Sequence, residues 1–371
     1  MGEMTIQEIS KTDKQAMMRF ATLERKLLGE YPLYVSNFDK EVIRHLSGNS
    51  PAGRGMEIAL YIASDGNRDV ARCGALINPK YQEAKNEKVG FIGYFAAAPN
   101  SEINVNSMLE HAEAWLKERG IKRVITPFNG NAFLGYGLLT AAFDEEPVLF
   151  CGWNPSYYPA YFTQAGYQPK YPMLLYTSDF RSEKYRAAKE NAAAKHDFQL
   201  RPINKKLWRS ELEIFREVIN ENFTKEWLWY PITQDEFLDS FEALKPMIDP
   251  RQMVIAEVQG KPAGVVIAYP IWNPLVRSFQ GKMGNLQKIQ FLFRGVHYET
   301  AGTAFVAVRS EYRGRWIGPA LMMATFQRYE ELGLKKAYVY TVDEDNLASR
   351  KMNEAVGAVP RLQYHAYDKN I

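Results

Sequence analysis

Residues Val306–Ala358 have the sequence VAVRSEYRGRWIGPALMMATFQRYEELGLKKAYVYTVDEDNLASRKMNEAVGA and contain the clearest succession of elements in the chain. An apolar strand ends in a turn with two glycines, and apolar residues at helical spacing then begin at about Ile317. Gly333 is placed to end that helix, because glycine adopts the left-handed conformation common just past a helix. The strand KKAYVYTV follows, and a shorter helix closes at Gly357. The stretch predicts the order strand, helix, strand, helix.

The first half of the chain repeats this order. GFIGYFAAAP reads as a strand, and Val105, Met108, Leu109 and Ala112 follow at helical spacing. Gly120 is placed to end this helix, and KRVITPF starts as a basic strand. The repetition indicates two copies of one structural unit.

The beginnings of the two halves also correspond. TIQEIS and FQLRPI are short alternating strands, and each precedes a helical stretch and a Tyr-Pro pair with Phe six residues beyond the proline. Thr233 and Glu236 form a capping box for the helix that follows the second pair. Two hairpins come next, with turns at Asp65-Gly66 and at Gly260.

Two tandem copies of one mixed unit, β-α-α-β-β-β-α-β-α-β, explain this order. We therefore predict an α/β protein of the α+β kind with a mixed sheet in each copy. The expected domains are residues 1–179 and 198–371. Residues 180–197, which include the charged and Ala-rich RSEKYRAAKENAAAKH, are expected to form a linking helix or exposed connector.

Composition excludes several classes of protein. The 371 residues are 46% hydrophobic and 24% charged, which is typical of a globular protein. A net charge of +3 over such a length gives no electrostatic footprint for nucleic acid. No apolar run approaches the roughly 18 residues of a membrane span, and the first residues lack a signal-peptide pattern. We expect a cytoplasmic protein with neither a nucleic acid nor a membrane partner, and the oligomeric state stays open.

Cysteines and histidines give no sign of a metal site. Cys73 and Cys151 are far apart in apolar surroundings, which favours two buried free thiols. The five histidines have no metal-ligand spacing. A metalloenzyme is not expected.

The turn before Ile317 has the features of an anion site. A strand that turns directly into a helix leaves the first helical N–H groups unpaired, and the helix dipole favours an anion there. Arg313 and Arg315 add charge, while Gly314 and Gly318 allow close backbone approach. A diphosphate group suits this turn; a plain strand-helix turn with solvated arginines is the structural alternative.

These residues resemble the GCN5-related N-acetyltransferase (GNAT) superfamily. Arg313–Gly318 matches the family pattern of Arg or Gln, two residues, Gly, one residue, then Gly or Ala, except at Trp316, and Asn346 precedes Gly357 by the family's eleven residues. The resemblance implies two tandem acyl-CoA N-acyltransferase folds. In the first copy, Pro99–Ser107 has neither the Arg nor the glycines, so that copy is expected to be degenerate.

The resemblance also implies a site for acetyl-CoA or another acyl-CoA in the second copy, without a metal. A backbone N–H on the strand before the turn polarises the thioester carbonyl in this family. The implied binding residues are Val306, Ala307, Val308, Arg313, Gly314, Arg315, Trp316, Ile317, Gly318, Pro319, Ala320 and Asn346. Trp316 stands where the family usually has Gly, so either the backbone is ordinary there or the loop is distorted. Its indole either covers the coenzyme or packs on the surface.

The family's usual acid is absent. Asn353 occupies the position, seven residues after Asn346, where the family often has a Tyr that protonates the leaving thiolate. An amide cannot be an acid at neutral pH, but it can hydrogen-bond the donor. Tyr364 and Tyr367 on the last strand are the alternative acids, and Tyr298 and Glu299 are the candidate bases, acting through water.

The acceptor surface is less well defined. Trp227, Trp229 and Tyr230 lie in FTKEWLWYP, where the family shapes its acceptor pocket, and they either line an apolar groove or join the two copies. An insertion at Trp272–Thr300 has no counterpart in the first copy and carries four basic residues, Arg277, Lys282, Lys288 and Arg294. These residues either receive an acidic or phosphate-bearing acceptor or form a solvated helical face.

We predict an enzyme that transfers an acetyl group from acetyl-CoA to the amine of a small molecule by direct attack in a ternary complex. One alternative is a non-catalytic protein with two coenzyme-binding or interaction modules, favoured by the departures at Trp316 and Asn353. The other is a tandem aminoacyl-transferase of the cell-wall type, a class that has a long coiled-coil insertion. Trp272–Thr300 is too short and irregular to be one.

Overall fold

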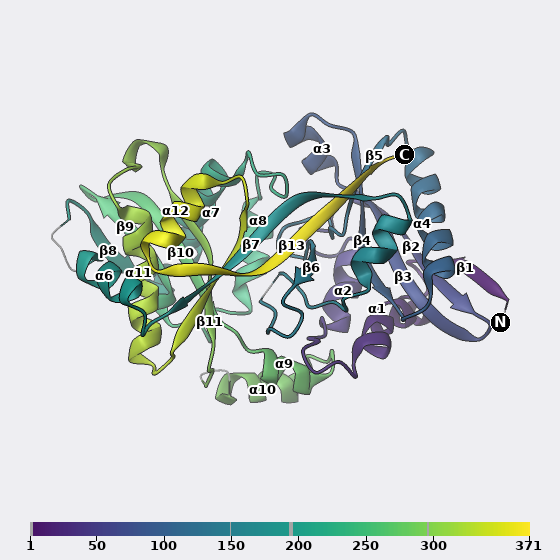
Figure 1. Ribbon diagram of the computed structural model, residues 1–371, viewed down its shortest axis with the longest axis horizontal. Coiled ribbons are helices and arrows are strands. Elements are labelled where there is room, and N and C mark those ends of the chain that lie inside the picture. Colours follow the sequence, from purple (N-terminus) through teal and green to yellow (C-terminus); the bar gives the residue numbers. More distant parts are fainter. Residues whose placement is uncertain (1–2, 149, 193–195, 295–296) are drawn as a thin grey trace. The chain divides into compact units, whose positions relative to one another are not determined.

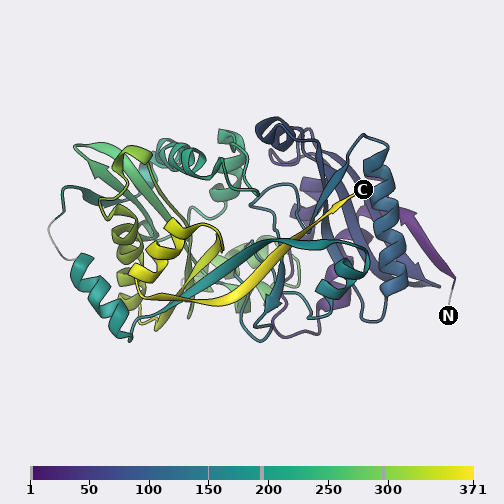
Figure 2. The same ribbon diagram turned by 45° about the horizontal axis from the view of Figure 1, so that its top comes forward.

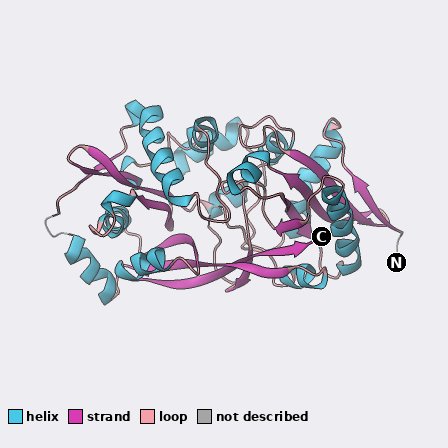
Figure 3. Cartoon of the chain, turned by 90° about the horizontal axis from the view of Figure 1, so that it is seen from above, coloured by secondary structure: helices cyan, strands magenta, loops and turns pink. Residues whose placement is uncertain are grey.

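The computed structural model describes residues 3–148, 150–192, 196–294 and 297–371 (Figure 1). The chain forms two compact units. The first consists of Met1–Pro172, Asn273–Phe291 and Tyr364–Ile371, and the second of Met173–Trp272 and Leu292–Gln363. Both combine helices with strands (Figure 3), so the predicted mixed α/β fold is confirmed.

The first unit is built on the strand order β1-β2-β3-β4-β5-β13. Its elements are β1 (Met4–Glu8), α1 (Lys14–Leu28), α2 (Asp39–Leu46), β2 (Glu57–Asp65), β3 (Arg68–Ile77), α3 (Pro79–Lys85), β4 (Val89–Ala97), α4 (Glu102–Lys117), β5 (Arg123–Thr126), β6 (Leu138–Ala141) and α5 (Tyr158–Gln164), with the end of β13 (Ala358–Asn370). The strands β4 and β5 are parallel, and the other paired neighbours are antiparallel. Helix α4 packs on β2 and β3 through buried residues such as Met108 and Ala112.

The second unit is built on the order β8-β9-β10-β11-β12-β7, in which only β11 and β12 pair in parallel. Its elements are the end of β7 (Gln168–Asp179), α6 (Glu183–Ala192), β8 (Gln199–Pro202), η1 (Lys205–Leu207), α7 (Trp208–Phe223), α8 (Gln234–Glu242), η2 (Pro250–Gln252), β9 (Met253–Val258), β10 (Lys261–Pro270), β11 (Ala301–Val308), η3 (Ser310–Tyr312), α11 (Ile317–Glu331), β12 (Lys336–Asp343) and α12 (Leu347–Ala355). Figure 2 shows α11 lying along this sheet, where its apolar residues pack on β10 and β11.

The order of elements repeats as the sequence predicts. Each copy has a first strand, two helices, a hairpin, a strand, a long helix, a strand, a short helix and a last strand, and the first copy adds α3 between its hairpin and β4 and β6 before α5. The hairpin turns lie at Gly66 and Gly260, both with positive φ, and the capping box of Thr233 and Glu236 is present. The insertion at Trp272–Thr300 contains α9 (Asn273–Phe279) and α10 (Asn285–Arg294).

The observed unit boundaries differ from the expected 1–179 and 198–371. The last strand of the second copy, β13, ends antiparallel to β5, with Tyr367 opposite Thr126. The last strand of the first copy, β7, ends antiparallel to β12, with Tyr176 opposite Val339. Each sheet therefore obtains a strand from the other copy, because β5 and β12 each leave one edge open for an antiparallel partner.

The expected linker, 180–197, contains the packed helix α6. Tyr185 of α6 is fully buried against Phe180 and Phe326, and its hydroxyl donates to Glu330 at 3.1 Å. This segment is a part of the second unit rather than an exposed connector; its residues 193–195 lie outside the described residues.

None of the described helices is both long enough and apolar enough to cross a bilayer.

Candidate active site

The pairing of β11 and β12 stops near the middle of each strand. In the described residues, Gly302 pairs with Tyr338 and Thr303 with Val339, and the two strands are unpaired beyond that point. On the other side of β11, the register with β10 shifts, so that Phe305 faces Ile267 while Thr303 faces Ala268. Ala304 is the extra residue of a β-bulge, which bends the strand and takes backbone groups out of the ladder. Backbone groups at the centre of the second sheet thus lie outside the β11–β12 ladder.

The turn after β11 has the geometry of an anion site. Gly314 has φ +82° and α11 begins at Ile317 without a side-chain cap. The first N–H groups of the helix are unpaired in such a case, and the positive end of the helix dipole lies there. Added at Gly314, a Cβ would meet nothing within 4 Å. The backbone can therefore approach a phosphate group closely.

Two arginines flank the turn and are exposed. Arg313 donates to Asn222 Oδ1 at 2.9 Å, and Arg315 lies 3.0 Å from Asp197 Oδ2. Surface contacts of this kind hold a side chain only weakly, so both cations remain able to turn toward an anion. Both residues stay predicted ligands.

Trp316 takes the left-handed conformation, with φ +66° and ψ 12°. This conformation costs a residue with a side chain roughly 1–2 kcal/mol. The indole stacks on the ring of His196, with centroids 5.6 Å apart and an interplanar angle of 6°, and His196 stacks on Phe198 at 4.7 Å. The aromatic stack offsets the strain, so the loop keeps the glycine-like backbone although its side chain is large.

Gly318 is explained by packing within the second unit. A Cβ at this position would lie 2.7 Å from Met352 Sδ, on α12. The glycine thus lets α12 approach the first turn of α11 closely. Pro319 and Ala320 follow in that first turn, as the sequence predicts.

Two predicted site residues are asparagines of α12: Asn346 is its N-cap and Asn353 lies within the helix. Asn346 caps the helix by accepting the N–H of Ser349 at 3.0 Å, and it donates to Glu226 Oε1 at 3.1 Å. Asn353 is fully buried, and its amide nitrogen donates to the Ser349 carbonyl at 2.9 Å. Its Oδ1 atom has no hydrogen-bond partner among the described residues. A free buried acceptor can take a hydrogen bond from a bound molecule, and Asn353 stays a predicted site residue.

The predicted substrate residues are packed in the second unit. Trp229 is fully buried, contacts the ring of Phe305 on β11 at 5.8 Å and donates to Asn220 Oδ1 at 3.1 Å. Tyr230 is buried and donates to Glu236 at 2.8 Å, and Trp227 is 9% exposed. Trp229 thus supports β11 beside the bulge. Its part in lining an acceptor groove remains a prediction.

Tyr298 and Glu299 lie just before β11. The Tyr298 hydroxyl accepts a hydrogen bond from Gln252 Nε2 at 2.7 Å, and burial raises the pKa of Tyr298 to about 12. A phenol with such a pKa is neutral at physiological pH and cannot serve as a phenolate base. Glu299 is exposed.

Tyr364 and Tyr367 belong to the first unit, whereas the anion turn belongs to the second. Tyr364 is fully buried and donates to the carbonyl of Cys151 at 3.3 Å. Tyr367 lies in the core of the first unit, with its ring stacked on Phe162 at 6.0 Å. The pairing of β13 with β5 explains the position of Tyr367, and the role of both phenols as acids stays a prediction.

Two carboxylates that the sequence analysis did not select lie near the ends of β12 and α12. Glu226, in the connection between α7 and α8, bonds to Asn346. Asp343 ends β12 and accepts the N–H of Asp345 at 3.0 Å, and burial raises the pKa of its carboxyl group. No motif singles them out, because their position depends on how α7 packs on β10 and β11 and how α12 packs on β12.

The corresponding region of the first copy is filled by tyrosines of α5. Tyr158 accepts the N–H of Ala97 at 2.8 Å, at the end of β4. Tyr161 accepts the N–H of Ser101 at 3.2 Å and donates to the carbonyl of Ala98 at 2.7 Å. The backbone groups before α4 are therefore satisfied by side chains, and Glu102 adds a negative charge to the first turn of this helix. These contacts are those of a degenerate copy.

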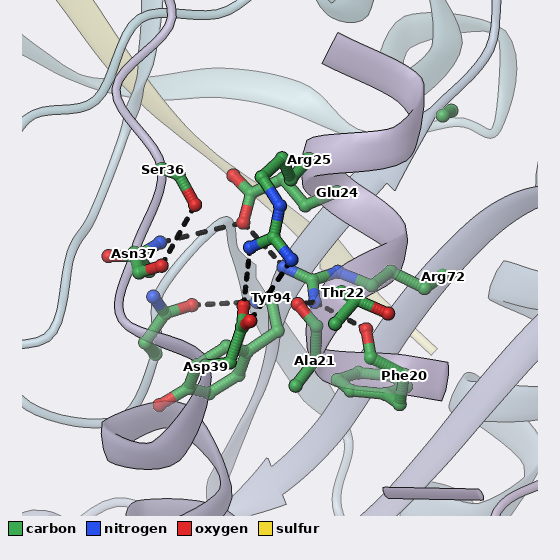
Figure 4. Close-up of polar contacts among 12 residues, drawn as sticks. Phe20, Ala21, Thr22, Glu24, Arg25, Ser36, Asn37, Asp39, Arg72 and Tyr94 are labelled. Atoms are coloured by element: carbon green, nitrogen blue, oxygen red, sulfur yellow. Dashed lines mark hydrogen bonds and ion pairs between the residues drawn. The ribbon is translucent and has the colours of Figure 1, made fainter. Parts of the chain in front are cut away.

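A polar cluster around Arg72 and Arg25 in the first unit joins α1 to its neighbouring elements (Figure 4). Arg72 is 1% exposed and donates to the carbonyls of Phe20 at 2.6 Å and Ala21 at 3.0 Å, and it pairs with Glu24 at 2.5 Å. Arg25 binds Asp39 through two hydrogen bonds of 2.7 and 3.0 Å. Each guanidinium has a carboxylate partner, so the cluster fastens α1 to β3 and α2.

Among the described residues, no group of three or more His, Cys, Asp or Glu side chains is placed to hold a metal ion.

Comparison with known proteins agrees with this geometry. Residues 211–358 match the model of the acetyltransferase (GNAT) family. A tandem GNAT protein from the clavulanic acid biosynthesis pathway has the same fold, with a TM-score of 0.58 and 13% identity over 99% of this chain and 98% of that one. The whole chain is thus similar in fold to a tandem GNAT protein, and its residues 211–358 match the GNAT family.

Two curated proteins are similar over nearly the whole length. Protein YghO of Escherichia coli is 24% identical, covering 98% of this chain and 94% of its own. A bacterial ceramide synthase of Caulobacter vibrioides is 26% identical, covering 95% of this chain and 94% of its own. The family match supports acyl-CoA-dependent N-acyl transfer as the class of activity.

Proposed function

We propose that this chain transfers an acyl group from acyl-coenzyme A to an amine at the second unit, by direct attack in a ternary complex. The observation that carries the proposal is the succession of the bulge at Ala304, the unpaired ends of β11 and β12, and the uncapped start of α11. Free backbone donors at a strand and at a helix start are what a thioester carbonyl and a diphosphate require.

The residues that would hold the donor follow from this geometry. The N–H groups at the start of α11, with Arg313 and Arg315, would bind the diphosphate, and the free Oδ1 of Asn353 would accept an N–H of the pantetheine arm. A backbone N–H in Val306–Val308 or at the neighbouring bulge would polarise the carbonyl. The donor supplies an activated thioester, and the chain supplies position and charge stabilisation.

The amine must lose a proton when its nitrogen attacks. Of the candidate bases, Asp343 combines a carboxylate with a pKa raised by burial, which brings it closer to the ordinary working pH. Glu226 is the second candidate through its bond to Asn346. Because Tyr364 and Tyr367 are both buried, we assign protonation of the leaving thiolate to water.

Two forms of the reaction are compared, which differ in the acyl group of the donor and in the amine that accepts it. The sequence favours acetyl transfer to a small-molecule amine, in line with the name of the matching family. The relative described as a bacterial ceramide synthase covers 95% of this chain, and a ceramide is the amide of a fatty acid with a long-chain amino alcohol. We favour the second form, a fatty acyl donor with a long-chain amine, because this likeness includes both copies of the fold.

The test is a matrix of donors and acceptors. Acetyl-CoA and palmitoyl-CoA are each incubated with a long-chain amino alcohol or with short soluble amines, and both thiol release and the amide product are measured, the latter by mass spectrometry. We expect amine-dependent release with palmitoyl-CoA and the long-chain amine, and loss of about 10²–10⁴ in rate for Asp343→Asn if it accepts the proton.

Two results would count against this proposal. Amide formation with acetyl-CoA and a short amine alone would establish the acetyl form. Binding of coenzyme A without any amine-dependent thiol release would favour the non-catalytic alternative.

A further inference from the structure

Helix α10, Asn285–Arg294, carries a cluster of exposed apolar side chains. Leu286 is 62% exposed, Ile289 52%, Leu292 51% and Phe293 76%. The other large apolar side chains that are exposed in the described part of the chain are distributed singly, such as Ile103 on α4 and Leu347 on α12. Single exposed apolar residues are normal, whereas four on one short helix mark an interaction surface.

The apolar face of α10 points away from the helix's own packing contact. Phe291 is 6% exposed and its ring contacts Phe279 of α9 at 6.0 Å. At about 100° per residue, Leu286, Ile289 and Phe293 share one face, and Phe291 lies on the opposite side. The helix is thus held by one aromatic anchor and presents its more apolar side outward.

Basic residues border this face. From Val258 to Tyr298 the sequence contains no Asp or Glu. Arg277 pairs with Glu146 at 2.6 Å, whereas Lys282, Lys288 and Arg294 have no carboxylate within ion-pair distance among the described residues. On the helix, Lys288 and Arg294 lie on the two flanks of the apolar face. This is the distribution of a helix that lies in the plane of a membrane interface.

We propose that α10 binds the surface of an anionic lipid bilayer, with Leu286, Ile289, Leu292 and Phe293 at the acyl-chain boundary and Lys282, Lys288 and Arg294 toward the headgroups. The expectation of no membrane partner rested on the lack of a spanning segment, and an interfacial helix needs none. A symmetric contact between two copies is disfavoured, because it would bring the unpaired cations of both copies together. The inference concerns where the protein acts and does not depend on which amine is acylated.

The test is vesicle flotation of the full chain. Phosphatidylcholine vesicles with and without phosphatidylglycerol are used, at low and high salt. We expect flotation with the anionic vesicles that weakens at high salt. Phe293→Asp with Ile289→Asp should reduce the bound fraction by about tenfold or more, because each side chain loses its apolar burial. Lys288→Glu with Arg294→Glu should reduce binding to the anionic vesicles.

The matched control is Ile103→Asp, which places the same charge at a 70% exposed apolar residue of α4; it should float like the unmodified chain. Thermal unfolding and calorimetric titration with coenzyme A show that the variants are folded, since α10 holds no proposed catalytic or coenzyme-binding residue. No flotation with either vesicle would overturn the proposal. So would flotation that the α10 variants leave unchanged, or a lipid-free dimer that Phe293→Asp abolishes.

Discussion

Trp316 shows how one residue can keep a backbone conformation usually assigned to glycine. Its φ of +66° preserves the turn into α11, and its indole stacks on His196. The sequence left open whether the turn would be ordinary or distorted, because the pattern gives a residue's position but not the ring that will pack on it. The N–H groups that define the anion site are those of the backbone, so they are independent of the indole.

Replacement of Trp316 by Gly should therefore leave acyl-CoA binding nearly unchanged. The variant gains about 1–2 kcal/mol from relief of strain and loses about 0.5–1.5 kcal/mol of aromatic contact, so its stability should also stay close to that of the parent. Calorimetric titration and thermal unfolding measure both quantities. A loss of binding of tenfold or more would show that the indole itself contacts the coenzyme.

Asn353 offers a sharper test at the same scale. Its buried Oδ1 lacks a partner among the described residues, and a buried unsatisfied acceptor costs about 1–3 kcal/mol. Asn353→Leu should thus raise the melting temperature while weakening acyl-CoA binding severalfold. Stability and affinity moving in opposite directions would identify a binding residue. A variant with lower stability and unchanged affinity would contradict this role.

At the scale of elements, the stability of each sheet depends on the contacts that hold the long helices on it. Sequence periodicity predicts α1, α4, α7 and α11, because the spacing of apolar residues is local information. It does not predict Arg72, a strand residue that is buried and fastens α1 by two backbone carbonyls and Glu24. A charged residue in an alternating strand reads as a solvent-facing position, and only the tertiary arrangement supplies its partners.

Arg72→Ala should lower the free energy of unfolding by about 3–5 kcal/mol, since it leaves Glu24 and two carbonyls without their donor. The control is Arg19→Ala, which removes a more exposed ion pair between α1 and Asp69 and should cost about 1 kcal/mol or less. Urea denaturation of both variants gives the comparison. Equal effects would mean that the Arg72 cluster is not structural.

For the whole molecule, the exchange of last strands is the feature that sequence reasoning missed. Each copy's order of elements is predictable, but which edge a strand joins is decided by contacts far apart in the chain. Tyr364 and Tyr367 were assigned to the second copy as acids for this reason, whereas β13 carries them into the first unit. Spacing alone predicts Asn353 and the turn as site residues, and both stay predictions. Glu226 and Asp343 needed the packed structure.

A chain that ends at Gln363 should therefore lose the first unit's stability, although the deleted residues lie far from it in the sequence. The deletion removes the partner of β5 and the buried rings of Tyr364 and Tyr367. We expect low solubility or a lost unfolding transition in scanning calorimetry. If this shortened chain unfolds like the full chain, the exchange does not contribute to stability.

The central claim is that acyl-coenzyme A binds once per chain, at the start of α11. The most direct measurement is calorimetric titration of acyl-CoA into the full chain and into the matched variants Gly314→Asp and Gly314→Asn. Both side chains tolerate the left-handed conformation and enter open space, so they differ only in charge. We predict one site per chain, with affinity reduced about tenfold or more by Asp and little by Asn. Two sites per chain, or equal affinity in both variants, would contradict the assignment.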